Sequence, residues 1–359
     1  CLPNDTLSSF ECFPEKYFGF IESALDTLRA VDRLGSIRRV QGRFDEAEVL
    51  LRKALKGRQR IVGEAHPDTV SSLNNMGLLL ANSGRLREAV PYFDRAIRRY
   101  RASSDSSPEK LLTVLDNAGQ NFARLGLPAE AEALLREALE ERQRMLGSDH
   151  PDTLRSMNNL GAVLVKSGRG DEAEQLYRDA LEGRRRVLGD HHLDTMSSVH
   201  NMAFFLAQRG QLDEARLHYQ QVLDAFVATE RTDQVGYLVA LSNMGNLLRS
   251  TGDLTEAELY HRRSVAGYQR VLGDTHPSTV TAMHNLGVLL ESRRDFNEAA
   301  ALYTAVITVS RVELGNDHPD TLVTMDRLAK VYMQLDNPQA SEPLAREYML
   351  AMTRAQPDS

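Results

Sequence analysis

Asparagine recurs at one position of a 42-residue period in this sequence. An amide side chain carries both a hydrogen-bond donor and an acceptor, so a row of amides can pair with the exposed backbone of an extended peptide. The alternative is that each amide bonds only its own helix or the neighbouring repeat. The six members of this amide column are Asn75, Asn117, Asn159, Asn201, Asn243 and Asn285.

The amide column belongs to a helical stripe with further binding candidates. In one repeat the stripe is Arg155, Asn159, Ala162 and Lys166, spaced i, i+4, i+7 and i+11. Together with Arg124, its cations predict an acidic ligand segment, because a buried charge binds when it is matched in sign; the alternative is that they are simply solvated. Phe204 is an anchor if it is exposed and a core residue otherwise. Gln208 and Asn246 complete the predicted peptide-binding set.

Two columns of small residues define the period. Glycine occurs at positions 42, 84, 126, 168, 210 and 252, and the count continues to Arg294 and Asp336. Alanine keeps the same step from Ala47 to Ala299. Self-similarity at a fixed period predicts a repeat array, here eight units over residues 26–353. We expect residues 1–25 to be an irregular segment or a degenerate cap, and residues 354–359 a tail.

Each 42-residue repeat is predicted to contain two helices. Met157, Leu160 and Leu164 follow the i, i+3, i+7 spacing of an amphipathic helix, and Gly168 can end it in the left-handed conformation. A second stripe follows from Ala173 to Leu181, and Arg184, Arg185 and Arg186 near its end favour the negative pole of the helix dipole. The sequence therefore predicts an all-α chain of eight helix-turn-helix units, an α-solenoid.

The sequence resembles kinesin-light-chain-type tetratricopeptide repeats, which also occur in nephrocystin-like proteins. The resemblance rests on Asn158-Asn159-Leu160-Gly161, Asp171-Glu172-Ala173-Glu174, Leu188-Gly189 and the recurring His-Pro-Asp-Thr joint. It covers nearly the whole chain. It implies a right-handed superhelix with the first helix of each pair on the concave side, and an asparagine ladder at the amide column.

Other functions find little support in the sequence. The histidines of the joint recur with the period and lie apart, and His200 and His284 lack partners for a ligand set, so we expect no metal and no cofactor. No nucleophile or phosphate-loop motif is present, which disfavours an enzyme. The net charge of −7 disfavours nucleic acid. Without a long apolar run or a signal sequence, we expect a cytoplasmic protein that does not enter the membrane.

Two functional hypotheses remain. The first is a scaffold that binds a peptide or protein segment in its concave groove. The second is a sensor or autoinhibitory arm of a larger kinase, NTPase or protease, favoured by the opening Cys1 and the degenerate first residues. The last helix carries Leu344, Tyr348 and Met349 without an obvious polar cap, so we expect that end to be covered by more chain, a partner or a second copy.

Overall fold

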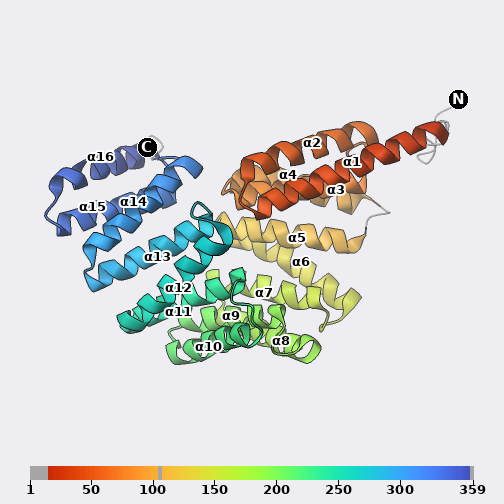
Figure 1. Cartoon of the computed structure of the whole chain (residues 1–359). Coiled ribbons are helices and arrows are strands. Elements are labelled where there is room, and N and C mark those ends of the chain that lie inside the picture. The colour runs from red at the N-terminus through yellow and green to blue at the C-terminus, as the bar shows by residue number, and fades with distance from the viewer. Residues whose placement is uncertain (1–14, 104–106, 356–359) are drawn as a thin grey trace. The chain divides into compact units, whose positions relative to one another are not determined.

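The computed structural model describes residues 15–103 and 107–355, and these residues form sixteen α-helices and no strand (Figure 1). The chain is thus an all-α solenoid of paired helices, as predicted. It divides into two units, residues 1–180 and 181–359. The first contains α1 (Glu15–Val40), α2 (Phe44–Val62), α3 (Pro67–Asn82), α4 (Leu86–Ala102), α5 (Pro108–Arg124), α6 (Pro128–Leu146), α7 (Pro151–Lys166) and the start of α8 (Gly170–Leu188).

The second unit contains the end of α8 and the remaining helices. These are α9 (Leu193–Gln208), α10 (Leu212–Ala228), α11 (Val235–Thr251), α12 (Leu254–Leu272), α13 (Pro277–Arg293), α14 (Phe296–Glu313), α15 (Pro319–Gln334) and α16 (Pro338–Ala355). Each odd-numbered helix is the first of a repeat and each even-numbered helix is the second. Consecutive helices pack together from α1 to α7 in the first unit and from α9 to α16 in the second.

The turn inside each repeat forms where the glycine column predicts it. Gly84 has a φ of 81° and Gly168 a φ of 74°, in the left-handed region that glycine enters without strain. The column keeps this conformation where it loses glycine, because Arg294 has a φ of 66° and Asp336 a φ of 53°. The unbroken register therefore sets the backbone even where residue type changes.

The joint between repeats is a helix N-cap. The Nδ1 atoms of His66, His150, His192, His276 and His318 each accept a hydrogen bond from the backbone N–H two residues later, at 3.1 to 3.2 Å. Proline follows four of these histidines at a position where the helix needs no backbone donor. The joint histidines are therefore structural. The altered joint at 228–234 turns at Glu230, which has a φ of 55°.

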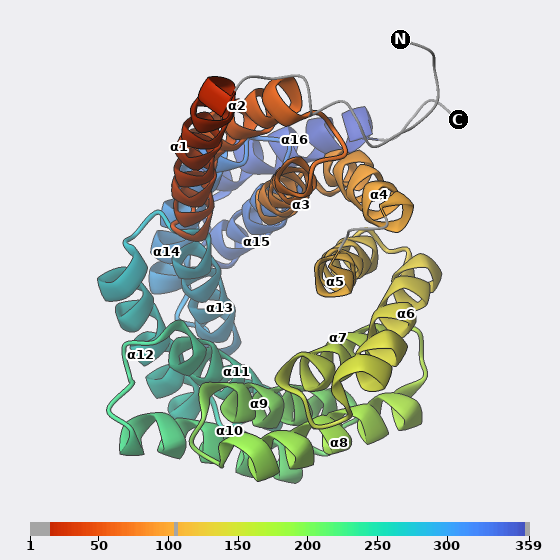
Figure 2. The same ribbon diagram turned by 90° about the vertical axis from the view of Figure 1, so that its right-hand side faces the viewer.

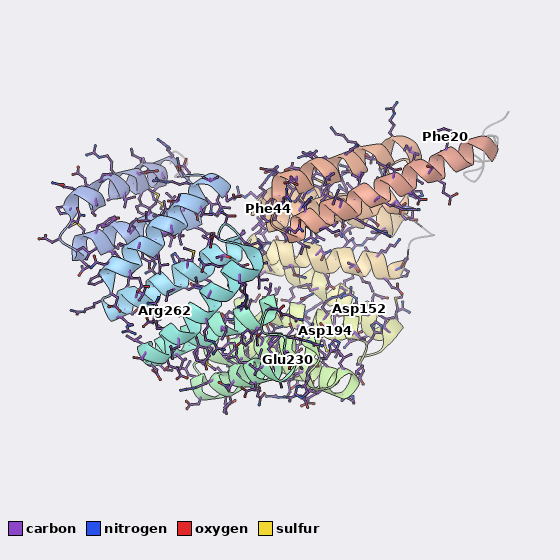
Figure 3. The ribbon with its side chains drawn as sticks, in the orientation of Figure 1. Phe20, Phe44, Asp152, Asp194, Glu230 and Arg262 are labelled. Atoms are coloured by element: carbon purple, nitrogen blue, oxygen red, sulfur yellow. The ribbon has the colours of Figure 1, made fainter. Side chains whose placement is uncertain are left out.

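Two expectations need correction. Residues 15–25 are not irregular, because they extend α1 and carry Phe20 at its free end, 81% exposed (Figure 3). The other residues of the predicted 1–25 segment lie outside the described range. Arg184 does not face the helix dipole as Arg185 and Arg186 do: it is buried and donates to the backbone oxygen of Asp194 and to Ser198.

Odd-numbered helices lie next to one another within each unit. In the first unit α1 contacts α3, α3 contacts α5 and α5 contacts α7, whereas in the described chain no even-numbered helix makes comparable contacts with the next even one. In the second unit α11 contacts both α9 and α13. Figure 2 shows the same order in the first unit, with α4 and α6 to the right of α3 and α5. The odd-numbered helices therefore form the inner layer of each unit, as the family resemblance implied.

Close packing inside a repeat depends on glycine in the odd helix. A Cβ added at Gly77 would lie 2.7 Å from Cε1 of Phe93, whose ring is fully buried. We expect Gly77→Ala to lower the free energy of unfolding by about 1–3 kcal/mol, since a packed core resists added volume. Gly19 in α1 has nothing within 4 Å of the same position. Gly19→Ala should therefore be neutral or stabilising by up to about 1 kcal/mol. Urea titration of both variants measures the difference, and an equal loss in the two would contradict this explanation.

Candidate functional site

The predicted binding stripe lies on the exposed side of the odd-numbered helices. The six amides Asn75, Asn117, Asn159, Asn201, Asn243 and Asn285 are all half-buried. Around them, the side chains predicted to bind are exposed except for half-buried Asn246: they are Arg124, Arg155, Lys166, Phe204 and Gln208. Each unit therefore presents three amides with polar and basic neighbours on its inner layer.

Most of these amides are tied to the preceding repeat. Asn75 Nδ2 donates to Asp32 Oδ2 at 2.6 Å, and Asn117 Nδ2 donates to Asn74 Oδ1 at 2.9 Å. Asn243 Nδ2 lies 3.0 Å from His200 Nε2, which must accept because the amide nitrogen can only donate. All three ties span 43 residues, so each joins an odd-numbered helix to the odd-numbered helix before it.

The fourth tie belongs to the same series. Asn159 hydrogen-bonds the carboxylate of Asp116, again 43 residues earlier. The ties match the alternative interpretation of the amide column, in which each Asn bonds the neighbouring repeat. They also leave part of each amide available, since a nitrogen with two N–H groups uses one and the carbonyl oxygen is a separate acceptor.

Sequence reasoning missed the residues that receive these bonds. They are Asp32, Asn74, Asp116 and His200, each one place before the amide position of its repeat. The same place is also polar in the other repeats, with Asn158, Ser242 and His284. The signal was present as a polar column at the same period, but its residue types vary, so a search for repeated identities does not find it.

Beneath this layer, buried arginines join an odd-numbered helix to the next one. Arg142 in α6 pairs with Asp116 in α5 and donates to Ser156 in α7. Arg58 makes the equivalent contacts with Asp32 at 3.4 Å and with Ser72 at 2.6 Å. Burial raises the pKa of Asp116, while the positive charge of Arg142 acts in the opposite direction. These clusters fix the spacing between the helices that carry the amides.

The three predicted cations differ in their surroundings. Arg155 forms an ion pair with Asp152 at 2.8 Å, next to the N-terminus of α7, where Asp152 is labelled in Figure 3. Arg124 and Lys166 are exposed and form no ion pair within the described residues. Two of the three cations are therefore free to meet an acidic ligand, and Arg155 is partly neutralised.

Phe204 fulfils the condition set for an anchor, because its side chain is 49% exposed on α9. His200, one turn before it, has a pKa lowered to about 4 by burial and packs edge-on against Tyr219 with ring centroids 5.4 Å apart. His284 hydrogen-bonds Thr324 at 3.0 Å. Both histidines thus have structural partners within the second unit.

Nowhere in residues 15–103 and 107–355 do three His, Cys, Asp or Glu side chains gather closely enough to hold a metal ion. Among the described helices, none combines the length and apolar character that a membrane crossing requires.

A family model supports the repeat architecture directly. The tetratricopeptide repeat model matches residues 26–102, 110–186, 157–228 and 236–311, well over half of the chain. The chain therefore belongs to the tetratricopeptide repeat family. A comparison with curated proteins gave no match.

Solved structures show the same fold. A Rap protein complexed with Competence and Sporulation Factor is 12% identical, with a TM-score of 0.65 over 96% of this chain and 89% of that one. A Podospora anserina protein described as a kinesin light chain is 23% identical, with a TM-score of 0.52 over 58% and 99%. A STAND protein with a tetratricopeptide repeat sensor from Pyrococcus horikoshii is 12% identical, with a TM-score of 0.58 over 96% and 54%.

Proposed function

We propose that this chain is a protein-protein interaction scaffold that binds an extended peptide segment along the odd-numbered helices. The observation that carries the proposal is the row of half-buried amides, three in each unit, bordered by exposed polar and basic side chains. The solved Rap protein, which has the same fold, is complexed with Competence and Sporulation Factor. Tetratricopeptide repeats typically serve as non-enzymatic scaffolds, and we propose no catalytic role for this chain.

The ties between repeats prepare the amides for binding. Because Asn75, Asn117 and Asn243 each hold their Nδ2 in a bond to the preceding repeat, their carbonyl oxygens are held in fixed directions. A fixed acceptor loses little conformational entropy when a peptide N–H donates to it. The structural and binding roles of these amides are thus compatible.

The charges favour an acidic segment in the first unit. We expect the double charge reversal Arg124→Glu and Lys166→Glu to weaken binding of acidic peptides at least about tenfold, because two free cations become anions beside the ligand. The measurement is binding of the full chain to an array of 12-residue peptides, half of them rich in Asp and Glu, followed by titration of the strongest binder.

The matched control reverses two charges on an even-numbered helix. Lys53 and Lys56 on α2 are exposed and form no ion pair in the described part of the chain. Lys53→Glu with Lys56→Glu should change the affinity for the same acidic peptide by less than about twofold. Salt in the buffer screens the long-range effect of the changed net charge, which both double variants share. Equal losses in the two double variants would refute a groove for acidic segments.

The second candidate function is a sensor arm of a larger protein. It is favoured by the fold shared with the STAND sensor and by α16, where Met349 is 64% exposed and Leu350 is 53% exposed. Under this alternative the apolar side chains of α16 contact further chain, a partner or a second copy. If a second copy of the chain covers α16, Met349→Gln with Leu350→Gln should convert dimers to monomers in sedimentation. A wild-type chain that is monomeric at every concentration would exclude a second copy at this surface.

A further inference from the structure

One buried position between repeats changes in size along the chain. It lies near the end of the even-numbered helices α2 to α14, and its first member, Arg58, contacts both α1 and α3. We call it the interhelical column, and every member is at most 5% exposed. Its members are Arg58, Tyr100, Arg142, Arg184, Phe226, Tyr268 and Ser310. Six repeats thus fill this space with a long side chain, and the seventh places a serine there.

The serine leaves a pocket. A pocket of about 380 Å³ lies between α13, α14 and α15, and its lining includes Ser310, His284 and Thr324. His284 and Thr324 hold the positions that Asp32 and Ser72 hold in the first repeat. There Asp32 and Ser72 bond Arg58. The volume is within the range of sites that bind small ligands or single side chains.

The fifth repeat shows what a filled version of this space is like. Phe226 in α10 stands at the position of Ser310, is 3% exposed and packs edge-on against Tyr237 of α11, with ring centroids 5.9 Å apart. The pocket of the fifth repeat is lined by residues from α8 to α10, such as His191 and Val222, and by none from α11. The Phe226 ring thus fills in the fifth repeat the position that Ser310 leaves open in the seventh.

The lining of the pocket favours an aromatic occupant. Val280, Val306, Val309 and Val323 supply apolar walls. In the fifth repeat, His200 holds the position of His284, and the interhelical column there contains the aromatic side chain of Phe226. The buried arginines Arg58 and Arg142 of the column instead meet the carboxylates of Asp32 and Asp116. A neutral histidine and valines thus suit a ring better than a guanidinium.

The floor and the rim of the pocket add polar groups. Thr324 Oγ1 donates to the backbone oxygen of Asp320, so it accepts from His284 Nδ1 and leaves His284 Nε2 as an acceptor. The carboxylates of Glu313 and Asp320 line the pocket and pair with no Lys or Arg within the described residues. Uncompensated carboxylates attract a cation.

We propose that this pocket takes an aromatic side chain of a partner peptide, next to a Lys or Arg that meets Glu313 and Asp320. The inference rests on the proposed peptide-binding function. It assigns to the second unit a preference for a basic segment, whereas the first unit is proposed to prefer an acidic one. Its residues are separate from Arg124 and Lys166, so either proposal can fail without the other.

The test is titration of the full chain with N-acetyl-Tyr-Lys-amide by saturation-transfer NMR. The expected dissociation constant is about 1 mM or lower, and N-acetyl-Tyr-Glu-amide and N-acetyl-Ala-Lys-amide should each bind at least about fivefold more weakly. Ser310→Phe, which copies the fifth repeat, should weaken the Tyr-Lys probe at least about tenfold. Ser292→Phe, at an exposed position of α13 outside the pocket lining, should leave its affinity unchanged.

Charge selectivity supplies an independent measurement. Glu313→Gln with Asp320→Asn keeps the pocket open and should reduce the preference for Tyr-Lys over Tyr-Glu to within about twofold. Unchanged affinity in Ser310→Phe, or equal binding of the Ala-Lys probe, would overturn the pocket assignment. Tyramine binding as tightly as the Tyr-Lys probe would assign the pocket to a free aromatic amine and overturn the peptide source.

Discussion

Asp116→Ala is expected to lower the free energy of unfolding by about 3–5 kcal/mol, since it removes one partner of a buried ion pair. Asp116 is 3% exposed and Arg142 is 2% exposed, and they pair across α5 and α6. Without the carboxylate, the guanidinium stays buried with Ser156 as its remaining side-chain partner. The tie from Asn159 to Asp116 is lost in the same change. Urea denaturation followed by circular dichroism measures the loss.

Two further variants separate the buried pair from charge in general. Asp152→Ala breaks the exposed pair with Arg155 and should cost at most about 1 kcal/mol. Asp116→Asn combined with Arg142→Tyr copies the second repeat, where Asn74 and Tyr100 hold these positions, and should recover most of the loss. A loss below about 1 kcal/mol for Asp116→Ala would show that the buried pair does not stabilise the first unit.

The backbone of the array could be predicted because local geometry repeats with the register. Glycine at position 168 marks a turn that needs a left-handed residue, and the register alone places Arg294 and Asp336 in the same turn. The joint could be predicted for the same reason, since Pro and His act on the backbone next to them. Helix ends are local events that a single sequence shows directly.

The contacts between repeats could not be predicted in the same way. The interhelical column joins helices through side chains whose partners lie 10 to 26 residues away, and Arg142, Tyr100 and Phe226 fill one space with different chemistry. Arg184 illustrates the difficulty: beside Arg185 and Arg186 its burial has no separate signal in the sequence. The ties at the amide column were similarly hidden, because Asp116 and His200 share polarity and no residue type.

Acidification from pH 6.5 to pH 4 is expected to destabilise the second unit, and His261 is a main reason. His261 is fully buried in α12 against Gly245, and burial lowers its pKa to about 4, with a smaller contribution from the charge of Arg249. Because the folded-state pKa lies below the unfolded value of about 6.5, the unfolded chain takes up the proton first. Stability is therefore full above pH 6.5 and falls by up to about 1.4 kcal/mol per pH unit toward pH 4.

His261→Tyr tests this cause directly. The same position holds Tyr219 and Tyr303 in the neighbouring repeats, so the larger ring fits beside a glycine such as Gly287. Neither ring nitrogen of His261 has a hydrogen-bond partner in the described chain, and an unsatisfied buried polar group costs about 1–3 kcal/mol. The introduced hydroxyl can accept from Arg249, whose Nε is also without a partner there.

We therefore expect His261→Tyr to raise stability at pH 7 by about 1–3 kcal/mol and to remove up to about 3 kcal/mol of the loss between pH 6.5 and pH 4. His200, whose pKa burial also lowers to about 4, should preserve part of the acid sensitivity in this variant. The measurement is a series of urea titrations across that pH range. His191→Tyr, at an exposed joint position, is the control and should leave the slope unchanged. An unaltered slope in His261→Tyr would mean that the buried imidazole is not what makes the second unit sensitive to acid.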